Sequence, residues 1–258
     1  MISKPSTVLA IAFAVLSIAP ACRTATPAQP PQASSPPAPA ARAPQTDARP
    51  SQAILWTRSS AEHRALFLQV YGAARAHVER EAERRPGGGW AVVLDADETV
   101  IDNSLYQLER ERAGLPFDGP SWQAWTKRRE ALPQPGAQAF LARVRELGGR
   151  IAIVTNRTES ECPDTQAVFR AHGLVYDVML CKPDGGSSDK NPRFEAVARG
   201  ATPAALPPLE VVAFLGDNIQ DFPGLGQTIR NEGDSAFAAF GARYFVLPNP
   251  MYGSWERN

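Results

Sequence analysis

Short apolar runs alternate with helix-like segments over most of the chain. Five runs have the length of a buried strand, and they lie at residues 90–94, 151–154, 175–180, 211–215 and 244–247. Helices are expected between them, over residues 61–85, 138–147, 164–172 and 193–198. Glycine or proline follows the first three of these segments, which is typical of helix ends. In the first helix, the apolar spacing places on one side Leu66, Val70, Ala73, Ala74 and His77.

Strands that alternate with helices predict right-handed βαβ units and a parallel sheet. The expected fold class is therefore α/β, a Rossmann-like parallel sheet with helices on both faces. Residues 105–135 stand between the first strand and the first crossover helix, and they contain helix-like pieces and turns. We expect them to form a small, mostly helical cap over the carboxyl edge of the sheet. Asp102 and Asn103 are expected to close the turn before this cap and to contact it.

Polar residues follow each of the first four predicted strands. In chain order they are Asp95 and Asp97, then Thr155 and Asn156, then Lys182 and Lys190, and then Asp217 and Asp221. Because the carboxyl ends of parallel strands meet at one edge of the sheet, we expect these side chains to lie close together. Carboxylates beside a core need a cation or hydrogen bonds to offset their burial. The pattern therefore predicts a reactive metal site at this edge.

The N-terminus has the features of an export signal. A lysine precedes an apolar core and small residues follow it, so residues 1–21 are expected to be a signal peptide. Cys22 stands where lipoprotein processing attaches lipid, although Ala19 replaces the leucine that is usual in such signals. The alternative is ordinary cleavage, which leaves a soluble protein that starts at Cys22. Residues 22–50 are rich in Pro and Ala and are expected to be an extended tether.

Charge and cysteine content narrow the functional classes. The 258 residues carry 27 basic and 27 acidic side chains, a balance that argues against nucleic acid as a partner. Apart from Cys22, the cysteines are Cys162 and Cys181, near the ends of neighbouring predicted strands. In an exported protein this pair indicates a disulfide, and two buried free thiols are the alternative.

The four polar clusters resemble the motifs of the haloacid-dehalogenase-like superfamily of phosphohydrolases. Asp95-x-Asp97-x-Thr99 is similar to its first motif, Thr155 to the second, a lysine of the third loop to the third, and Gly216-Asp217-x-x-x-Asp221 to the fourth. A closer likeness, carried by residues 56–62, 94–104, 216–222 and 248–256, is to the class C bacterial acid phosphatases, the lipoprotein 5′-nucleotidase family. The likeness covers residues 51–258 and implies a single phosphatase domain with a cap insertion.

The resemblance implies a role for each motif residue. Asp95 is expected to attack phosphorus and form an aspartyl-phosphate, and Asp97 is expected to act as general acid and then general base. Thr155, the backbone amide of Asn156 and Lys190 are expected to bind the phosphoryl oxygens. Lys182 remains the alternative to Lys190.

The resemblance also implies a Mg²⁺ site. The expected ligands are the carboxylates of Asp95 and Asp217 and the backbone carbonyl of Asp97, with the Asp97 side chain away from the cation. Asp221 is expected to bind through a water or to orient the other ligands.

Family analogy implies nucleoside monophosphates as substrates, with a base held between a cap aromatic and Tyr252. Trp122 and Trp125 are the cap candidates, and the alternative is that they form the core of the cap itself. The competing functions are a broad-specificity acid phosphatase, a phosphoacceptor domain and a non-catalytic, surface-anchored binding lipoprotein. We expect contact with a membrane through the lipid anchor alone, in the outer membrane, or a soluble periplasmic protein if Cys22 is not lipidated.

Overall fold

A computed structural model describes residues 49–257 of the chain. The predicted signal peptide, Cys22 and nearly all of the predicted tether lie outside these residues. Among residues 49–257, no helix is both long enough and apolar enough to cross a membrane.

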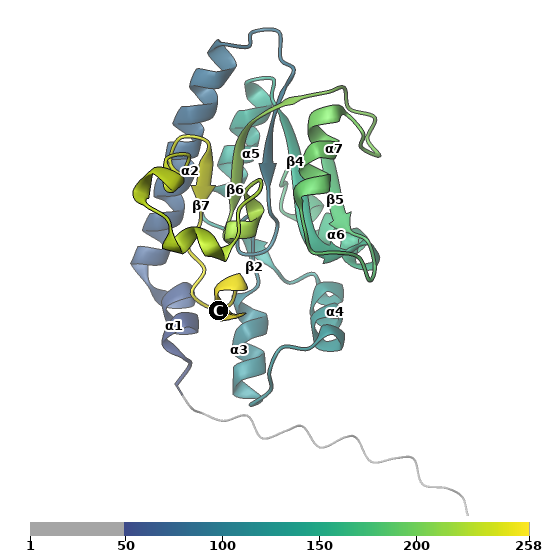
Figure 1. Ribbon diagram of the computed structural model, residues 1–258. Helices are drawn as coiled ribbons and strands as arrows, with labels where there is room; N and C mark the ends of the chain where they lie inside the picture. Colours follow the sequence, from purple (N-terminus) through teal and green to yellow (C-terminus); the bar gives the residue numbers. More distant parts are fainter. Residues whose placement is uncertain (1–48, 258) are drawn as a thin grey trace, which may run out of the picture. The chain divides into compact units, whose positions relative to one another are not determined.

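The core of the protein is a five-stranded parallel sheet, which confirms the predicted fold class (Figure 1). The strand order is β5-β4-β1-β6-β7. The strands are β1 (Trp90–Leu94), β4 (Arg150–Thr158), β5 (Val178–Lys182), β6 (Glu210–Gly216) and β7 (Tyr244–Val246). Each strand coincides with a predicted apolar run, but β4 continues to Thr158 and β5 begins at Val178, three residues later than expected.

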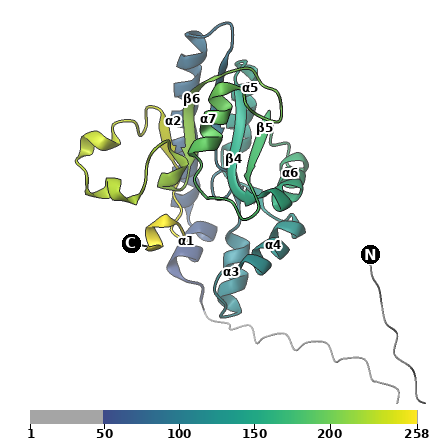
Figure 2. The same ribbon diagram turned by 45° about the vertical axis from the view of Figure 1, so that its right-hand side comes forward.

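Helices cover both faces of this sheet. They are α2 (Ala61–Glu83), α5 (Ala137–Glu146), α6 (Cys162–Ala171) and α7 (Asn191–Arg199). Helix α1 (Gln52–Ser59) precedes them and contacts α2. Val92 and Leu94 of β1 belong to the core cluster that contains α2, α5 and α6, whereas Val93 belongs to the cluster that contains α7. Figure 2 shows α7 in front of the strands and α2 behind them. Because both faces of the sheet are buried, its strands are continuous apolar runs.

The N-terminal helices differ from the sequence expectation in two respects. Helix α1 was not predicted, and α2 buries a different side from the predicted one. The buried residues of α2 include His63, Phe67, Tyr71, Ala74 and Val78. Leu66, by contrast, is 38% exposed. Two apolar stripes lie side by side on this helix, and the stripe with the larger rings of Phe67 and Tyr71 packs against the sheet.

A small cap follows β1 at the carboxyl ends of the strands. Helices α3 (Ser104–Arg112) and α4 (Gly119–Arg128) lie between β2 (Ile101–Asp102) and β3 (Leu132–Pro133), which pair as a short antiparallel ribbon. The rings of Tyr106, Trp122 and Trp125 pack together inside the cap, with centroids 5.1 and 6.1 Å from that of Tyr106. Figure 1 shows α3 and α4 grouped beyond one end of the sheet.

The remaining elements of the described residues are short 3₁₀ helices, of which η2 lies close to the carboxyl end of β6. They are η1 (Glu159–Glu161), η2 (Ile219–Asp221), η3 (Gln227–Asn231), η4 (Asp234–Phe237) and η5 (Ser254–Arg257). Segment 248–257 returns to the capped end of the sheet, where Asn249 and Tyr252 contact residues of the first and fourth motifs.

A disulfide joins Cys162 to Cys181, with their Cα atoms 6.2 Å apart. It ties the first turn of α6 to strand β5. The structure therefore contains the disulfide that the two remaining cysteines indicated, in place of two free thiols.

Candidate active site

The polar residues that follow the strands come together at one edge of the sheet. Asp95 continues directly from β1, and its backbone N–H donates to the carbonyl of Leu215 in β6 (3.0 Å). Asp217 directly follows β6, and Lys190 directly precedes α7. The parallel register of the strands thus places four segments of the chain around one centre.

Lys190 lies between two carboxylates at this centre. Its Nζ atom donates to Asp95 Oδ1 at 2.5 Å and to Asp221 Oδ1 at 2.6 Å. Although burial alone would lower the pKa of Lys190, the charges of Asp221 and Asp95 raise it, so the amine stays protonated. Of the two lysines considered from sequence, Lys190 is the one that reaches Asp95; Lys182 is the last residue of β5.

Three carboxylates form a compact acidic group beside Lys190. Ligand oxygens of Asp95, Asp217 and Asp221 lie within 4.8 Å of one another. Burial raises the pKa of Asp95 to about 7, against the attraction of Lys190 and with the repulsion of Asp221 and Asp97. Burial, together with the charges of Asp221 and Asp95, also raises the pKa of Asp217 well above its usual value. Crowded, buried carboxylates are stabilised by a hard cation, so this oxygen-rich donor set fits a divalent ion.

Hydrogen bonds fix the two acids that follow β6. Asp217 accepts from Thr99 Oγ1 (3.3 Å) and from Asn249 Nδ2 (2.9 Å). Asp221 Oδ2 accepts the backbone N–H of Asn218 (2.9 Å), which closes a capping box at the start of η2. Since Asp221 Oδ1 is held by Lys190, the Asp221 side chain orients the lysine and closes the turn at the same time.

Asp97 is held apart from Lys190 by a different set of partners. Arg157 Nε donates to Asp97 Oδ1 (2.9 Å) and Oδ2 (3.2 Å), and Asn103 Nδ2 donates to Oδ1 (2.8 Å). The Arg157 side chain is 1% exposed, and its position after Thr155-Asn156 in the sequence does not indicate this burial. Sequence reasoning therefore missed Arg157, and it identified Asn103 as a turn residue without its role at Asp97.

Glu98, within the first motif, is a further residue that sequence reasoning passed over. It is 1% exposed and adopts a left-handed backbone conformation with φ 49°. Its carboxylate accepts the backbone N–H of Asn103 (2.8 Å) and the hydroxyl of Tyr252. Burial, with the nearby charges of Asp97 and Asp217, raises the pKa of Glu98 well above its usual value. Glu98 thus links the first motif to the C-terminal segment.

Thr155 and Asn156 lie at the same edge, in the second half of β4. Thr155 is buried, and its Oγ1 accepts the backbone N–H of Arg157 (3.1 Å), which leaves its hydroxyl proton to donate. Arg193 donates to the carbonyl of Thr155 and to Asn156 Oδ1 (2.6 Å). Through Arg193, the part of β4 that carries the Asn156 amide is tied to the first turn of α7.

The three candidate aromatics occupy different environments. Trp125 is 2% exposed and its Nε1 donates to Asn103 Oδ1 (2.9 Å), so the structure places it in the core of the cap. Trp122 and Tyr252 are half-buried and keep part of each ring at the surface. The alternative in which the cap tryptophans form its own core therefore holds for Trp125, while Trp122 and Tyr252 remain accessible.

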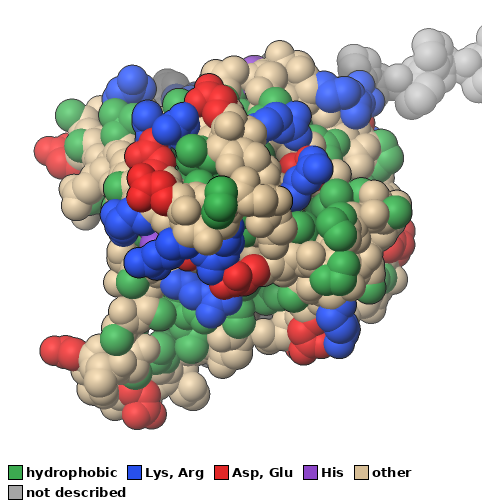
Figure 3. All heavy atoms as spheres, turned by 90° about the horizontal axis from the view of Figure 1, so that it is seen from above, with side chains coloured by type: hydrophobic (Ala, Val, Ile, Leu, Met, Phe, Trp, Pro, Cys, Tyr) green, Lys and Arg blue, Asp and Glu red, His purple; other side chains and the backbone are tan. Residues whose placement is uncertain are grey.

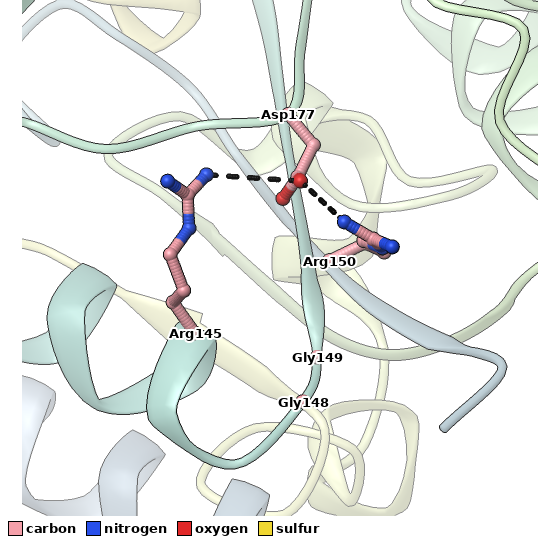
Figure 4. A pocket seen from close by; sticks show the side chains of 5 residues that line it. All are labelled: Arg145, Gly148, Gly149, Arg150 and Asp177. Atoms are coloured by element: carbon pink, nitrogen blue, oxygen red, sulfur yellow. Dashed lines mark hydrogen bonds and ion pairs between the residues drawn. The ribbon is translucent and has the colours of Figure 1, made fainter. Parts of the chain in front are cut away.

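The opposite end of the sheet carries a different set of charges. Lys and Arg side chains gather there with Asp and Glu among them (Figure 3). A hollow of about 390 Å³ lies at the start of β4, where Arg145 and Arg150 flank Asp177 (Figure 4). Asp177 Oδ1 accepts from Arg150 (2.9 Å) and forms an ion pair with Arg145 (3.7 Å). The motif residues are absent from its lining.

Comparison with known proteins agrees with this geometry. A family model described as HAD superfamily, subfamily IIIB (Acid phosphatase) matches residues 32–255. A class C acid phosphatase from Bacillus anthracis, solved with tungstate bound, is similar with a TM-score of 0.71, at 29% identity over 79% of this chain and 85% of that chain. A second structure of the Bacillus anthracis enzyme gives a TM-score of 0.70, with the same identity and coverage.

Proposed function

Because the chain belongs to the HAD subfamily IIIB acid phosphatases, we propose that this phosphomonoesterase is exported and hydrolyses nucleoside monophosphates through an aspartyl-phosphate. The observation that carries the proposal is the separation of two carboxylates within one motif. Asp95 is paired with Lys190, whereas Asp97 is held by Arg157 and Asn103. Two acids with different partners can take different roles in one reaction.

In the first half of the reaction, Asp95 is the nucleophile. A carboxylate oxygen of Asp95 attacks phosphorus, the bond between phosphorus and the ester oxygen breaks, and that oxygen takes a proton from Asp97. Lys190 offsets the negative charge of Asp95 as the phosphate approaches and then faces the charge that develops on the phosphoryl oxygens. The hydroxyl of Thr155 and the amide of Asn156 supply further donors to these oxygens.

In the second half, Asp97 acts as a base. It removes a proton from water, the water oxygen attacks phosphorus, and the bond to Asp95 breaks to release inorganic phosphate. Asp97 is again protonated and Asp95 is again a carboxylate, so the cycle closes.

The acidic group provides the donors for a divalent cation. We assign the carboxylates of Asp95 and Asp217 and the backbone carbonyl of Asp97 as ligands, with Asp221 orienting Lys190 or bound through a water. Mg²⁺ is the ion that these hard oxygen donors favour, and when bound it neutralises charge between the nucleophile and the substrate phosphate.

Base recognition is assigned to Tyr252 and Trp122. Both residues are half-buried, Tyr252 is held by Glu98, and Trp122 packs on one side against the Tyr106 ring. Stacking on a nucleobase contributes about 1–3 kcal/mol per base, enough to separate a nucleotide from a bare sugar phosphate.

A comparison of substrates tests the proposal. The purified full chain is assayed on AMP, ribose 5-phosphate and an aryl phosphate, with Mg²⁺ and after treatment with EDTA. We expect kcat/KM for AMP to exceed that for ribose 5-phosphate by about tenfold, as the stacking energy requires, and EDTA to abolish release. Equal rates on AMP and ribose 5-phosphate would support a broad-specificity acid phosphatase instead.

Anchoring at Cys22 is a separate part of the proposal. The sequence supports export followed by lipid attachment to this thiol, with residues 23–50 as a tether between the lipid and the catalytic domain. Fractionation of cells that produce the full chain is expected to place it with the outer membrane, and Cys22→Ser to release it into the periplasm. A Cys22→Ser protein that stays with the membrane would remove lipid attachment through this residue.

A further inference from the structure

We propose that Asn103 and Arg157 are positioning residues that fix the proton-transfer geometry of Asp97 and couple it to the cap. The inference rests on the proposed function, because it requires Asp97 to be the proton donor to the leaving group. It adds two residues and a structural link that the four motifs do not contain.

The side-chain amide of Asn103 is fully engaged. Its Nδ2 donates to Asp97 Oδ1 (2.8 Å) and to Glu98 Oε2 (3.4 Å). Its Oδ1 accepts from Trp125 Nε1 (2.9 Å) and from Arg157 Nη2 (2.9 Å). An amide offers two donor hydrogens and two lone pairs, so all of its hydrogen-bonding positions are used. Because Asn103 is 0% exposed, rotating this amide would place donors against donors with no water to compensate.

Arg157 anchors Asp97 from the other side. It is 2% exposed, and its Nη1 donates to Thr165 Oγ1 (3.1 Å) on α6. Thr165 in turn donates to the carbonyl of Glu161 (3.0 Å). The guanidinium is therefore fixed to the first turn of α6 while its Nε and Nη2 face Asp97.

These contacts distinguish the two oxygens of Asp97. Oδ1 accepts hydrogen bonds from Asn103 Nδ2 at 2.8 Å and from Arg157 Nε at 2.9 Å, and it forms an ion pair with Arg157 Nη2 at 2.8 Å. Oδ2 accepts from Arg157 Nε at 3.2 Å. An oxygen surrounded by donors cannot carry a proton without repulsion, so the transferable proton belongs on Oδ2.

The cap contacts both positioning residues. Trp125 of α4 donates to Asn103, and the Arg157 Cζ atom lies 5.3 Å from the centre of the Trp122 ring, within the range of a cation–π contact. The placement of α4 and the orientation of Asp97 therefore depend on the same two side chains. A substrate that packs against Trp122 would therefore contact a ring that itself contacts Arg157, one of the two residues that hold Asp97.

Dependence on the leaving group tests the proposal. An alcohol such as the ribose of AMP needs a proton when it leaves, whereas dinitrophenolate does not. A change that disturbs Asp97 must therefore lower kcat/KM for AMP far more than for dinitrophenyl phosphate. A change that merely destabilises the fold lowers both equally.

The variants are Asp97→Asn, Asn103→Ala and Trp125→Phe, with Tyr106→Phe as the matched control. Tyr106 is a cap residue of similar burial whose hydroxyl bonds to Ser121 (2.9 Å) instead of to Asn103. We expect Asp97→Asn to lower the AMP to dinitrophenyl phosphate ratio by about 100-fold, as for loss of a general acid. Asn103→Ala is expected to lower the ratio by about tenfold and Trp125→Phe by a few-fold, in the same direction. Tyr106→Phe should leave the ratio unchanged.

The outcomes distinguish the acid role of Asp97 from the positioning roles of Asn103 and Arg157. If Asp97→Asn lowers kcat/KM equally for AMP and for dinitrophenyl phosphate, the acid role of Asp97 in the proposed function is wrong. If Asp97→Asn is selective but Asn103→Ala and Trp125→Phe are not, the positioning roles are overturned and the proposed function stands. Should Asn103→Ala fail to fold, Trp125→Phe decides the question, because it keeps an aromatic ring in the cap core and removes the hydrogen bond to Asn103.

Discussion

Asp221 folds back so closely over Gly216 that a Cβ atom on Gly216 would lie 2.2 Å from the Cβ of Asp221. Packed interiors do not absorb such an overlap without movement. Glycine at this position therefore allows the turn after β6 to bring Asp221 to Lys190.

Gly216→Ala is expected to displace Asp221 and lower kcat/KM for AMP by about 100-fold, since small misplacements at a reacting centre have effects of this size. The assay is steady-state phosphate release. Gly233→Ala is the control, because a Cβ atom there meets nothing within 4 Å. Equal activity of the two variants would show that the close approach has no catalytic role.

The two lysines considered from sequence are separable by experiment. Lys190→Met removes a cation that is 4% exposed and leaves Asp95 and Asp221 to repel one another. We expect at least about a 100-fold loss of kcat, comparable with the loss of a fixed donor at the developing charge. Lys182→Met is the matched control and should retain most of its activity. The reverse ranking would transfer the phosphate-binding role to Lys182.

Much of the fold could be predicted because the strands are buried on both faces and therefore appear as continuous apolar runs. The first-motif acids could be placed because they follow a strand at one edge of the sheet, and Lys190 could be preferred to Lys182 because of the resemblance to the third motif of the family. Arg157 could not be placed, because the polar groups that bury it include Asp97 and Asn103, which lie more than 50 residues away in the sequence. The prediction of which side of α2 is buried was wrong for a related reason. The helix carries two apolar stripes, and which of them is buried depends on its packing against the sheet.

The disulfide between Cys162 and Cys181 is expected to contribute to stability rather than to chemistry. It closes a loop with a sequence separation of 19 residues, for which chain entropy predicts about 3 kcal/mol. The double variant Cys162→Ser/Cys181→Ser should lower the free energy of unfolding in urea by about this amount, while kcat well below the melting temperature changes little. The expectation would be contradicted if the double variant, and the unmodified protein treated with a reductant, both unfolded at the urea midpoint of the untreated, unmodified protein.

His63 makes stability depend on pH. Burial between α1 and the rest of α2 lowers its pKa below 6.5, although the charge of Asp102 opposes this shift. At His63 the unfolded chain therefore binds a proton more readily than the folded one, so the contribution of His63 to stability falls as the pH drops below 6.5. The raised pKa values of Asp95, Glu98 and Asp217 act in the opposite direction.

Urea unfolding between pH 5 and pH 8 measures this contribution. His63→Phe keeps an aromatic ring beside Trp56 and Phe67 and removes the contribution of His63. The stability of this variant relative to the unmodified protein should therefore rise as the pH drops below 6.5. His172→Gln is the control and should retain the slope of the unmodified protein. If His63→Phe loses as much stability on acidification as the unmodified protein, another group is responsible.

The most direct test of the central claim is to identify the phosphorylated side chain during turnover. The full chain is mixed with AMP and Mg²⁺, quenched in acid, and treated with borohydride, which reduces an acyl phosphate and leaves a free carboxylate unchanged. Mass spectrometry of the peptides should then find the reduced residue at Asp95, and Asp95→Asn should show neither the reduced residue nor phosphate release. Phosphate release by Asp95→Asn at the unmodified rate, or reduction at a different carboxylate, would contradict the assignment of Asp95 as the nucleophile.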